Sequence, residues 1–99
     1  MLTLPIKKKW FDMIKSGEKK EEYREIKPYY ASRFLHYIVA QKVTPNITNY
    51  VLFRNGYGKD KPTIKCGVKI SKGFGKLEWG AKYLEEYYVL KILSVEEIC

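Results

Sequence analysis

The sequence predicts a mainly β fold of the α+β class: a small, partly closed β-barrel with one or two helices on its rim. A chain of 99 residues makes one domain, which we expect to span residues 1–99. Apolar residues alternate at the strand period over several short segments and recur at helical spacing over two others. Short strands need closure or cover to protect their edges, which favours a barrel with helices on its rim.

The N-terminal half is expected to alternate strand and helix twice. The predicted elements are a strand at 2–6, a helix at 8–16, a strand at 19–26 and a helix at about 29–40. Pro5 indicates that the first strand lies at an edge, and Gly17 stands where a helix C-cap belongs. The segment at 19–26 leaves little room for a helix between that cap and Pro28, which itself fits the first turn of the second helix.

The C-terminal half is expected to consist mostly of strands. The predicted elements are a loop at 42–49, strands at 50–53, 63–71 and 87–95, a turn at 55–58, and a loop at 73–86 with room for one helical turn. The alternation in the middle strand places four apolar side chains on one face, namely Ile64, Cys66, Val68 and Ile70.

Positive charge is concentrated in the middle of the chain. The net charge is +8, and residues 31–76 hold nine of the 19 basic residues but only one acidic residue, Asp60. Aromatic residues interleave this stretch: Phe34, Tyr37, Tyr50, Phe53, Tyr57 and Phe74. Cations beside aromatic rings favour binding of single-stranded nucleic acid, whereas the alternative is a lysine-rich surface that serves solubility alone.

Several classes of protein are excluded by the sequence. No window approaches the ~18 apolar residues of a transmembrane helix, and the lysines at 7–9 follow the first apolar stretch, the wrong order for a signal peptide. We therefore expect a cytoplasmic protein with no membrane contact. One histidine, His36, and two cysteines, Cys66 and Cys99, form no metal-ligand pattern. We expect reduced thiols, no metal and no cofactor.

The segment at 16–25 carries the most informative pattern. Gly17 releases the chain from the first helix, and Glu22 and Arg24 project to one side of the following strand, near whose start Lys19 stands. An ammonium, a carboxylate and a guanidinium around one cleft can position a phosphate or a polar base edge, or support acid/base chemistry. The alternative is a solvated ladder of ion pairs, each contributing roughly a few tenths of a kcal/mol.

This segment also carries a family resemblance. The motif Gly17-x-Lys19-x-x-Glu22-x-Arg24, after Leu4-Pro-Ile6 and Trp10-Phe-x-x-Ile14, closely resembles the signature of the ASCH domain (activating signal cointegrator homology). Leu77-Glu-Trp-Gly80 and Tyr87-Tyr-Val-Leu-Lys-Ile92 look like the tail of small bacterial and phage members. The ASCH family belongs to the PUA-like superfamily. The resemblance implies a β-barrel with a cleft between helix and barrel, RNA as the ligand class, and Gly17, Lys19, Glu22 and Arg24 lining that cleft.

The resemblance also implies an alternative activity. One branch of the family consists of amidohydrolases that remove the acetyl group from N4-acetylcytidine. Lys19 and Arg24 match that branch, Glu22 takes the place of its threonine nucleophile, and Glu78 stands near the position of its distant glutamate. A carboxylate is a poorer acyl acceptor than an activated hydroxyl. In an enzyme, Glu22 or Glu78 would therefore be the base that activates water, with Lys19 holding the oxyanion.

Two glycine-rich loops and one strand add further candidate ligand contacts. Lys59 and Lys61 follow Gly56-Tyr-Gly58 in a predicted hairpin turn, where they can reach a nucleic-acid backbone. Trp79, in the second loop, either stacks a base or plugs one end of the barrel, and Tyr23 is a second candidate for stacking. The sequence thus predicts binding of RNA or a modified nucleoside. The amidohydrolase is the alternative, and a protein-interaction domain whose charge serves only solubility is a third interpretation.

Overall fold

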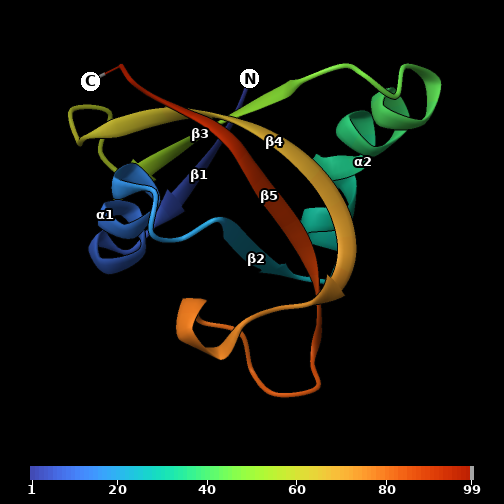
Figure 1. Cartoon of the computed structure of the whole chain (residues 1–99). Helices are drawn as coiled ribbons and strands as arrows, with labels where there is room; N and C mark the ends of the chain where they lie inside the picture. Colours follow the sequence, from blue (N-terminus) through green and yellow to red (C-terminus); the bar gives the residue numbers. More distant parts are fainter. Residues whose placement is uncertain (99) are drawn as a thin grey trace.

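The computed structural model describes residues 1–98, which form five strands, two α-helices and one short 3-10 helix (Figure 1). In chain order these are β1 (Leu2–Ile6), α1 (Lys8–Ser16), β2 (Glu21–Glu25), α2 (Pro28–Val43), β3 (Asn49–Asn55), β4 (Thr63–Phe74), η1 (Leu77–Trp79) and β5 (Glu86–Glu97). The predicted α+β class is confirmed, and every predicted helix and strand is present. The main differences are of length: α2, β3, β4 and β5 all extend beyond the predicted bounds, whereas β2 is shorter than the predicted 19–26 and leaves Lys19 in the connection before it. Neither helix is long and apolar enough to cross a membrane.

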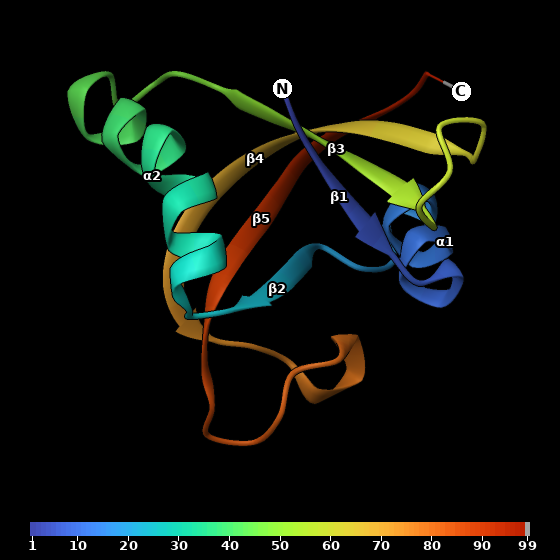
Figure 2. The same cartoon turned by 180° about the vertical axis from the view of Figure 1, so that it is seen from behind.

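All five strands belong to one curled mixed sheet in the order β1-β3-β4-β5-β2. The pairing of β1 with β3 is parallel, and the other three pairings are antiparallel. The long strands β4 and β5 bend, so the sheet forms a half-barrel with β1 and β2 as its free edges (Figure 2). The prediction that the Pro5 strand lies at an edge is confirmed, as is the partly closed barrel.

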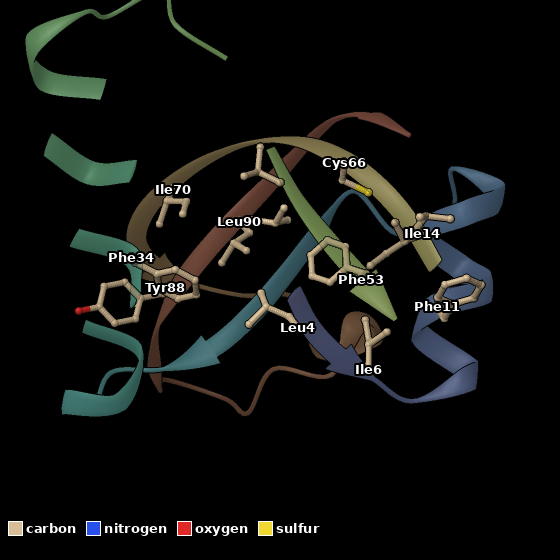
Figure 3. Packing of buried hydrophobic residues seen from close by; sticks show 13 residues of the cluster. Leu4, Ile6, Phe11, Ile14, Phe34, Phe53, Cys66, Ile70, Tyr88 and Leu90 are labelled. Atoms are coloured by element: carbon tan, nitrogen blue, oxygen red, sulfur yellow. The ribbon is translucent and has the colours of Figure 1, made fainter. Parts of the chain in front are cut away.

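The hydrophobic core fills the concave side of this half-barrel (Figure 3). The predicted inward face of β4 is confirmed, since Ile64, Cys66, Val68 and Ile70 are all at most 3% exposed. The two helices contribute to opposite ends of the core. From α1 come Phe11 and Ile14, and from α2 comes Phe34, which packs edge-on against Tyr88 at 5.2 Å between ring centroids. Helix α1 ends as predicted, at Gly17 in the left-handed conformation with φ 87°.

Candidate functional site: the seam cleft

A cleft of about 500 Å³ opens at the seam where the free edges of β1 and β2 face each other. We call it the seam cleft. Its walls come from the end of β1, the first turn of α1, strand β2, the start of α2, the loop after η1 and the start of β5. The lining residues are Pro5, Ile6, Lys7, Trp10, Glu22, Tyr23, Arg24, Glu25, Tyr30, Gly80, Lys82, Glu85 and Tyr87. This volume lies in the range of small-molecule sites, and aromatic walls with a few polar groups are typical of them.

A buried cluster of three charges lies at the base of the seam cleft. The Glu22 carboxylate stands between the two cations, with Oε1 3.3 Å from Lys19 Nζ and Oε2 2.7 Å from Arg24 Nη2. The exposed fractions of the three side chains are 0% for Lys19, 8% for Glu22 and 11% for Arg24. A solvated ladder of ion pairs is therefore not what these residues form. They form a largely dry cluster in which two cations share one anion.

The Arg24 guanidinium joins the two free edges of the half-barrel. Its Nη2 donates to the main-chain oxygen of Pro5 in β1 at 3.0 Å, and its Nη1 donates to the Tyr30 hydroxyl in α2 at 3.3 Å. Glu22 Oε2 accepts from both Nε and Nη2. Four of the five guanidinium N–H groups are thus used by residues 1–98, and one on Nη1 has no partner among them.

The electrostatic setting keeps Arg24 charged. Burial works against the charged form, but the Glu22 carboxylate and the Tyr30 hydroxyl outweigh it and raise the pKa of the guanidinium. A guanidinium with fixed partners and a remaining N–H can donate to a carbonyl or phosphate oxygen without reorganising.

Lys19 lies beneath the cleft and is absent from its lining. Its Nζ donates to the main-chain oxygen of Trp79 at 2.6 Å, and the rings of Trp10 and Tyr23 lie 5.0 and 4.8 Å away. Burial lowers the pKa of this ammonium, although Glu22 acts in the opposite direction. The left-handed cap at Gly17 turns the chain so that Lys19 directly follows α1, where its main-chain N–H bonds to Met13.

Aromatic side chains form two walls of the cleft. Trp10 and Tyr30 are half-buried, and Tyr23 is held by two hydrogen bonds, donating to Glu21 at 2.7 Å and accepting from the Lys76 main chain at 2.9 Å. Burial is the main reason why the pKa of Tyr23 is raised well above its usual value. Gly80 approaches the indole of Trp10 so closely that a Cβ there would lie 3.0 Å from the ring. These rings are therefore held in place before any ligand binds.

Charges of both signs surround the opening of the seam cleft. Lys7 and Lys82 are exposed cations, and Glu25 and Glu85 are exposed anions. Together with the internal cluster, which has one more positive than negative charge, these residues give the cleft a net positive charge. The arrangement suits a ligand that carries both a polar aromatic ring and a phosphate.

The other predicted site residues lie around the cleft rather than in it. Gly17 ends α1 and does not line the cleft. Trp79 is half-buried and supplies its main-chain oxygen to Lys19, while its ring contacts Lys76 Nζ at 4.5 Å. Glu78 is exposed on η1 and is not part of the lining. The structure thus brings together Lys19, Glu22, Tyr23 and Arg24 from the predicted set.

Lys59 and Lys61 do not line the seam cleft. Both are exposed in the turn between β3 and β4. A second hollow adjoins this turn and shares three wall residues with the seam cleft, Pro5, Ile6 and Lys7. The two lysines are therefore neighbours of the cleft through that hollow, and do not contribute to its base.

Sequence reasoning missed several contributors to the cleft, among them Trp10, Tyr30 and Lys7. Trp10 entered only through the family resemblance, and Lys7 only as one of a lysine run. The signal available at position 30 was the hydroxyl: a tyrosine on an inward helix face needs a hydrogen-bond partner, which phenylalanine does not. Here that partner is Arg24.

The comparisons with known proteins add no relative. No protein-family model, no curated protein and no solved structure matches the chain. Among residues 1–98, no group of three or more His, Cys, Asp or Glu side chains is placed to hold a metal ion. The geometry of the seam cleft is therefore the basis for assigning a function.

Proposed function

We propose that this chain is an ASCH-type domain of the PUA-like superfamily that binds RNA or a modified nucleoside in the seam cleft. One observation carries the proposal: the Arg24 guanidinium, fixed by Glu22, Pro5 and Tyr30, retains one N–H at a cleft walled by aromatic rings. The remaining N–H donates to a base carbonyl, and Trp10 or Tyr30 stacks on the base. Lys7 and Lys82, the two exposed cations at the opening of the cleft, contact phosphate.

The charge of the chain supports a polyanionic ligand. A net charge of +8 attracts nucleic acid from solution, and each phosphate neutralised by a lysine releases counterions. Affinity therefore falls as salt concentration rises. Stacking of a base in the cleft adds binding free energy that depends on the aromatic walls rather than on charge.

The test compares two lysines that are both exposed but differ in position. Lys7 lines the cleft, whereas Lys91 lies on β5 outside it. Fluorescence anisotropy with a labelled, mixed-sequence single-stranded RNA is measured at two salt concentrations for Lys7→Gln and Lys91→Gln. We expect Lys7→Gln to weaken binding several-fold more than Lys91→Gln. A Trp10→Leu variant, whose fold is checked by circular dichroism, is expected to lose about tenfold or more, the value of one base stacked on an aromatic ring.

Equal losses in the two lysine variants, with no effect of Trp10→Leu, would contradict the proposal. That result would describe a basic surface meeting a polyanion with no dedicated site. Binding that is insensitive to salt would contradict the phosphate contacts in particular.

A second candidate function, the N4-acetylcytidine-type amidohydrolase, has one observation in its favour. Burial lowers the pKa of Lys19, and ionisable groups with shifted pKa values are common in catalytic sites. Against it, both carboxylate oxygens of Glu22 are occupied by cations, so Glu22 must leave a partner before it can activate water. Turnover of N4-acetylcytidine that disappears in Lys19→Met would support the enzyme. RNA binding without product would support the binding domain.

A further inference from the structure

The C-terminal half of β4 also lacks a neighbouring strand on one side. Strand β3 pairs with β4 only as far as Val68, whereas β5 pairs with it through Phe74. The stretch at 69–74 therefore has a strand on one side only. Helix α2 runs beside this stretch in both views (Figures 1 and 2), and the two are in contact.

The side chain of Gln41 in α2 shows which main-chain groups face this open side. Its Oε1 accepts from the Ile70 N–H at 2.7 Å, and its Nε2 donates to the Ile70 carbonyl at 2.8 Å. This pair of bonds is what a neighbouring strand would make. Alternate residues of a strand direct their main-chain groups to the same side. The main-chain N–H and C=O groups of Lys72 and Phe74 therefore point to the same open side as those of Ile70. These groups have no hydrogen-bond partner among residues 1–98.

A groove of about 500 Å³ lies between α2 and this edge. We call it the α2–β4 groove; it is lined by Ala31, Leu35, Ile38, Gln41, Lys42, Ile70, Ser71, Lys72 and Tyr88. The apolar lining continues onto the outer face of α2. There Leu35, Val39 and Val43, spaced four residues apart, are 58%, 47% and 76% exposed. A helix that is apolar on its outer face usually has a partner.

The charge around the groove is of one sign. Its lining includes two lysines, Lys42 and Lys72, and no carboxylate. From Ile26 to Leu77 the sequence contains a single acidic residue, Asp60. A second copy of the same helix face would therefore meet like charge, whereas an acidic segment would meet opposite charge.

We infer that the α2–β4 groove binds an acidic peptide segment in extended conformation, which adds as a strand to the open edge of β4. The main-chain groups of Lys72 and Phe74 bond to the peptide backbone, as in other cases of strand addition to a sheet edge. Alternate apolar side chains of the peptide enter the groove beside Leu35 and Tyr88. Carboxylates on the same face of the peptide as these apolar side chains pair with Lys42 and Lys72. This site is separate from the seam cleft and does not depend on the function proposed for it.

The test uses a heptapeptide whose groove-facing positions 1, 3, 5 and 7 are glutamate, valine, valine and glutamate, with threonine between them, and its counterpart with lysine in place of glutamate. Titrated into ¹⁵N-labelled protein up to millimolar concentration, the acidic peptide is expected to perturb the amides of Lys72 and Phe74 and of the facing turns of α2. The basic peptide is expected to leave them unchanged. Absence of any perturbation by the acidic peptide would overturn the inference, as would equal binding of both peptides.

Three variants separate the contributions. Lys72→Pro removes an N–H that points away from β5, so the pairing with β5 remains, and we expect about tenfold or greater loss of peptide affinity. Lys72→Gln keeps that N–H and removes only the charge, and a smaller loss is expected. If Lys72→Pro disturbs the strand, Leu35→Glu is the second test: it places a carboxylate on an exposed wall and should repel the acidic peptide. Wild-type affinity in Leu35→Glu or in a folded Lys72→Pro would overturn the inference.

Two other occupants are outcomes of the same experiment. Single-stranded RNA that perturbs the groove amides and displaces the acidic peptide would make the groove a nucleic-acid surface and overturn the inference. If the wild type sediments as a dimer and Leu35→Glu as a monomer, the occupant of the groove is a second copy of the chain. That result would also overturn the inference. Unchanged peptide binding in Lys7→Gln would show that the groove works independently of the seam cleft.

Discussion

Two of the places where the half-barrel leaves its sheet unpaired are protected by different chemistry. At the seam between β1 and β2, the charged side chain of Arg24 reaches the Pro5 carbonyl. At the open half of β4, the neutral side chain of Gln41 bonds to both main-chain groups of Ile70. The neutral amide of Gln41 needs no partner beyond its two hydrogen bonds to Ile70. The buried guanidinium of Arg24 also needs a counter-ion, which Glu22 supplies.

We therefore expect the seam and the β4 edge to respond differently to mutation. The seam is a coupled unit, because Glu22 is the only carboxylate that either Lys19 or Arg24 pairs with among residues 1–98. Removing one member of a buried ion cluster leaves an uncompensated charge in a dry place. The β4 edge has no such coupling, since loss of Gln41 exposes only neutral main-chain groups beside a groove that water can enter.

The largest effect is expected for Glu22→Ala. This substitution leaves Lys19 and Arg24 both buried and unpaired, and we expect the free energy of unfolding to fall by about 3–5 kcal/mol. Glu22→Gln keeps one acceptor oxygen between the cations and should lose less. Urea denaturation of the three proteins measures the difference.

The matched control is an ion pair on the surface. Lys8 and Asp12 are 2.6 Å apart but 75% and 52% exposed, so Lys8→Ala should cost no more than about 0.5 kcal/mol. If Glu22→Ala costs as little as Lys8→Ala, then water reaches the two cations and the seam is not a coupled unit.

A smaller effect is expected for Gln41→Met, which keeps the length of the side chain but removes both hydrogen bonds. The N–H and carbonyl of Ile70 then lose their partner, at a cost of about 1–3 kcal/mol. The amide of Ile70 should also exchange its hydrogen faster than the amides of β4 that pair with β5. Unchanged exchange at Ile70 would show that the Gln41 bonds do not protect this edge.

The seam and the β4 edge also differ in how far the sequence predicted them. The local sequence pattern was sufficient to predict the cap at Gly17. It was also sufficient to place Glu22 and Arg24 on one face of β2, because they stand two residues apart in a strand. Other contacts join residues far apart in the sequence. Arg24 bonds to the carbonyl of Pro5, 19 residues earlier, and Lys19 bonds to the carbonyl of Trp79, 60 residues later. Such contacts depend on how the sheet curls, which alternation of residues does not encode.

The same limit explains what was missed at the β4 edge. The sequence predicted α2 and β4 as separate elements and placed Ile70 on the inward face of its strand, as the structure has it. Where β3 stops pairing with β4 depends on the register of the two strands, set here by Asn49 opposite Val68. The role of Gln41 follows from that register and has no signature in the sequence around it.

The smallest effect, and the one most specific to the seam, is a dependence of stability on pH. Burial lowers the pKa of Lys19 below its ordinary value of 10.5. Between the lowered pKa and 10.5, the unfolded chain holds the Lys19 proton more often than the folded chain does. The free energy of unfolding therefore rises with pH in that window, by this residue's contribution. Below the window Lys19 is protonated in both states and contributes no slope.

Comparison with Lys19→Met isolates that contribution, because Glu22 keeps its pairing with Arg24 in the variant. Denaturation of both proteins near neutral pH and just below pH 10.5 should show the wild type gaining stability relative to Lys19→Met as pH rises. Lys15, whose pKa is raised by the hydrogen bond and charge of Glu97, acts in the opposite direction but equally in both proteins, so it cancels. Parallel pH profiles would mean that Lys19 keeps its ordinary pKa, and that the second cation of the seam is solvated rather than held in a dry cluster.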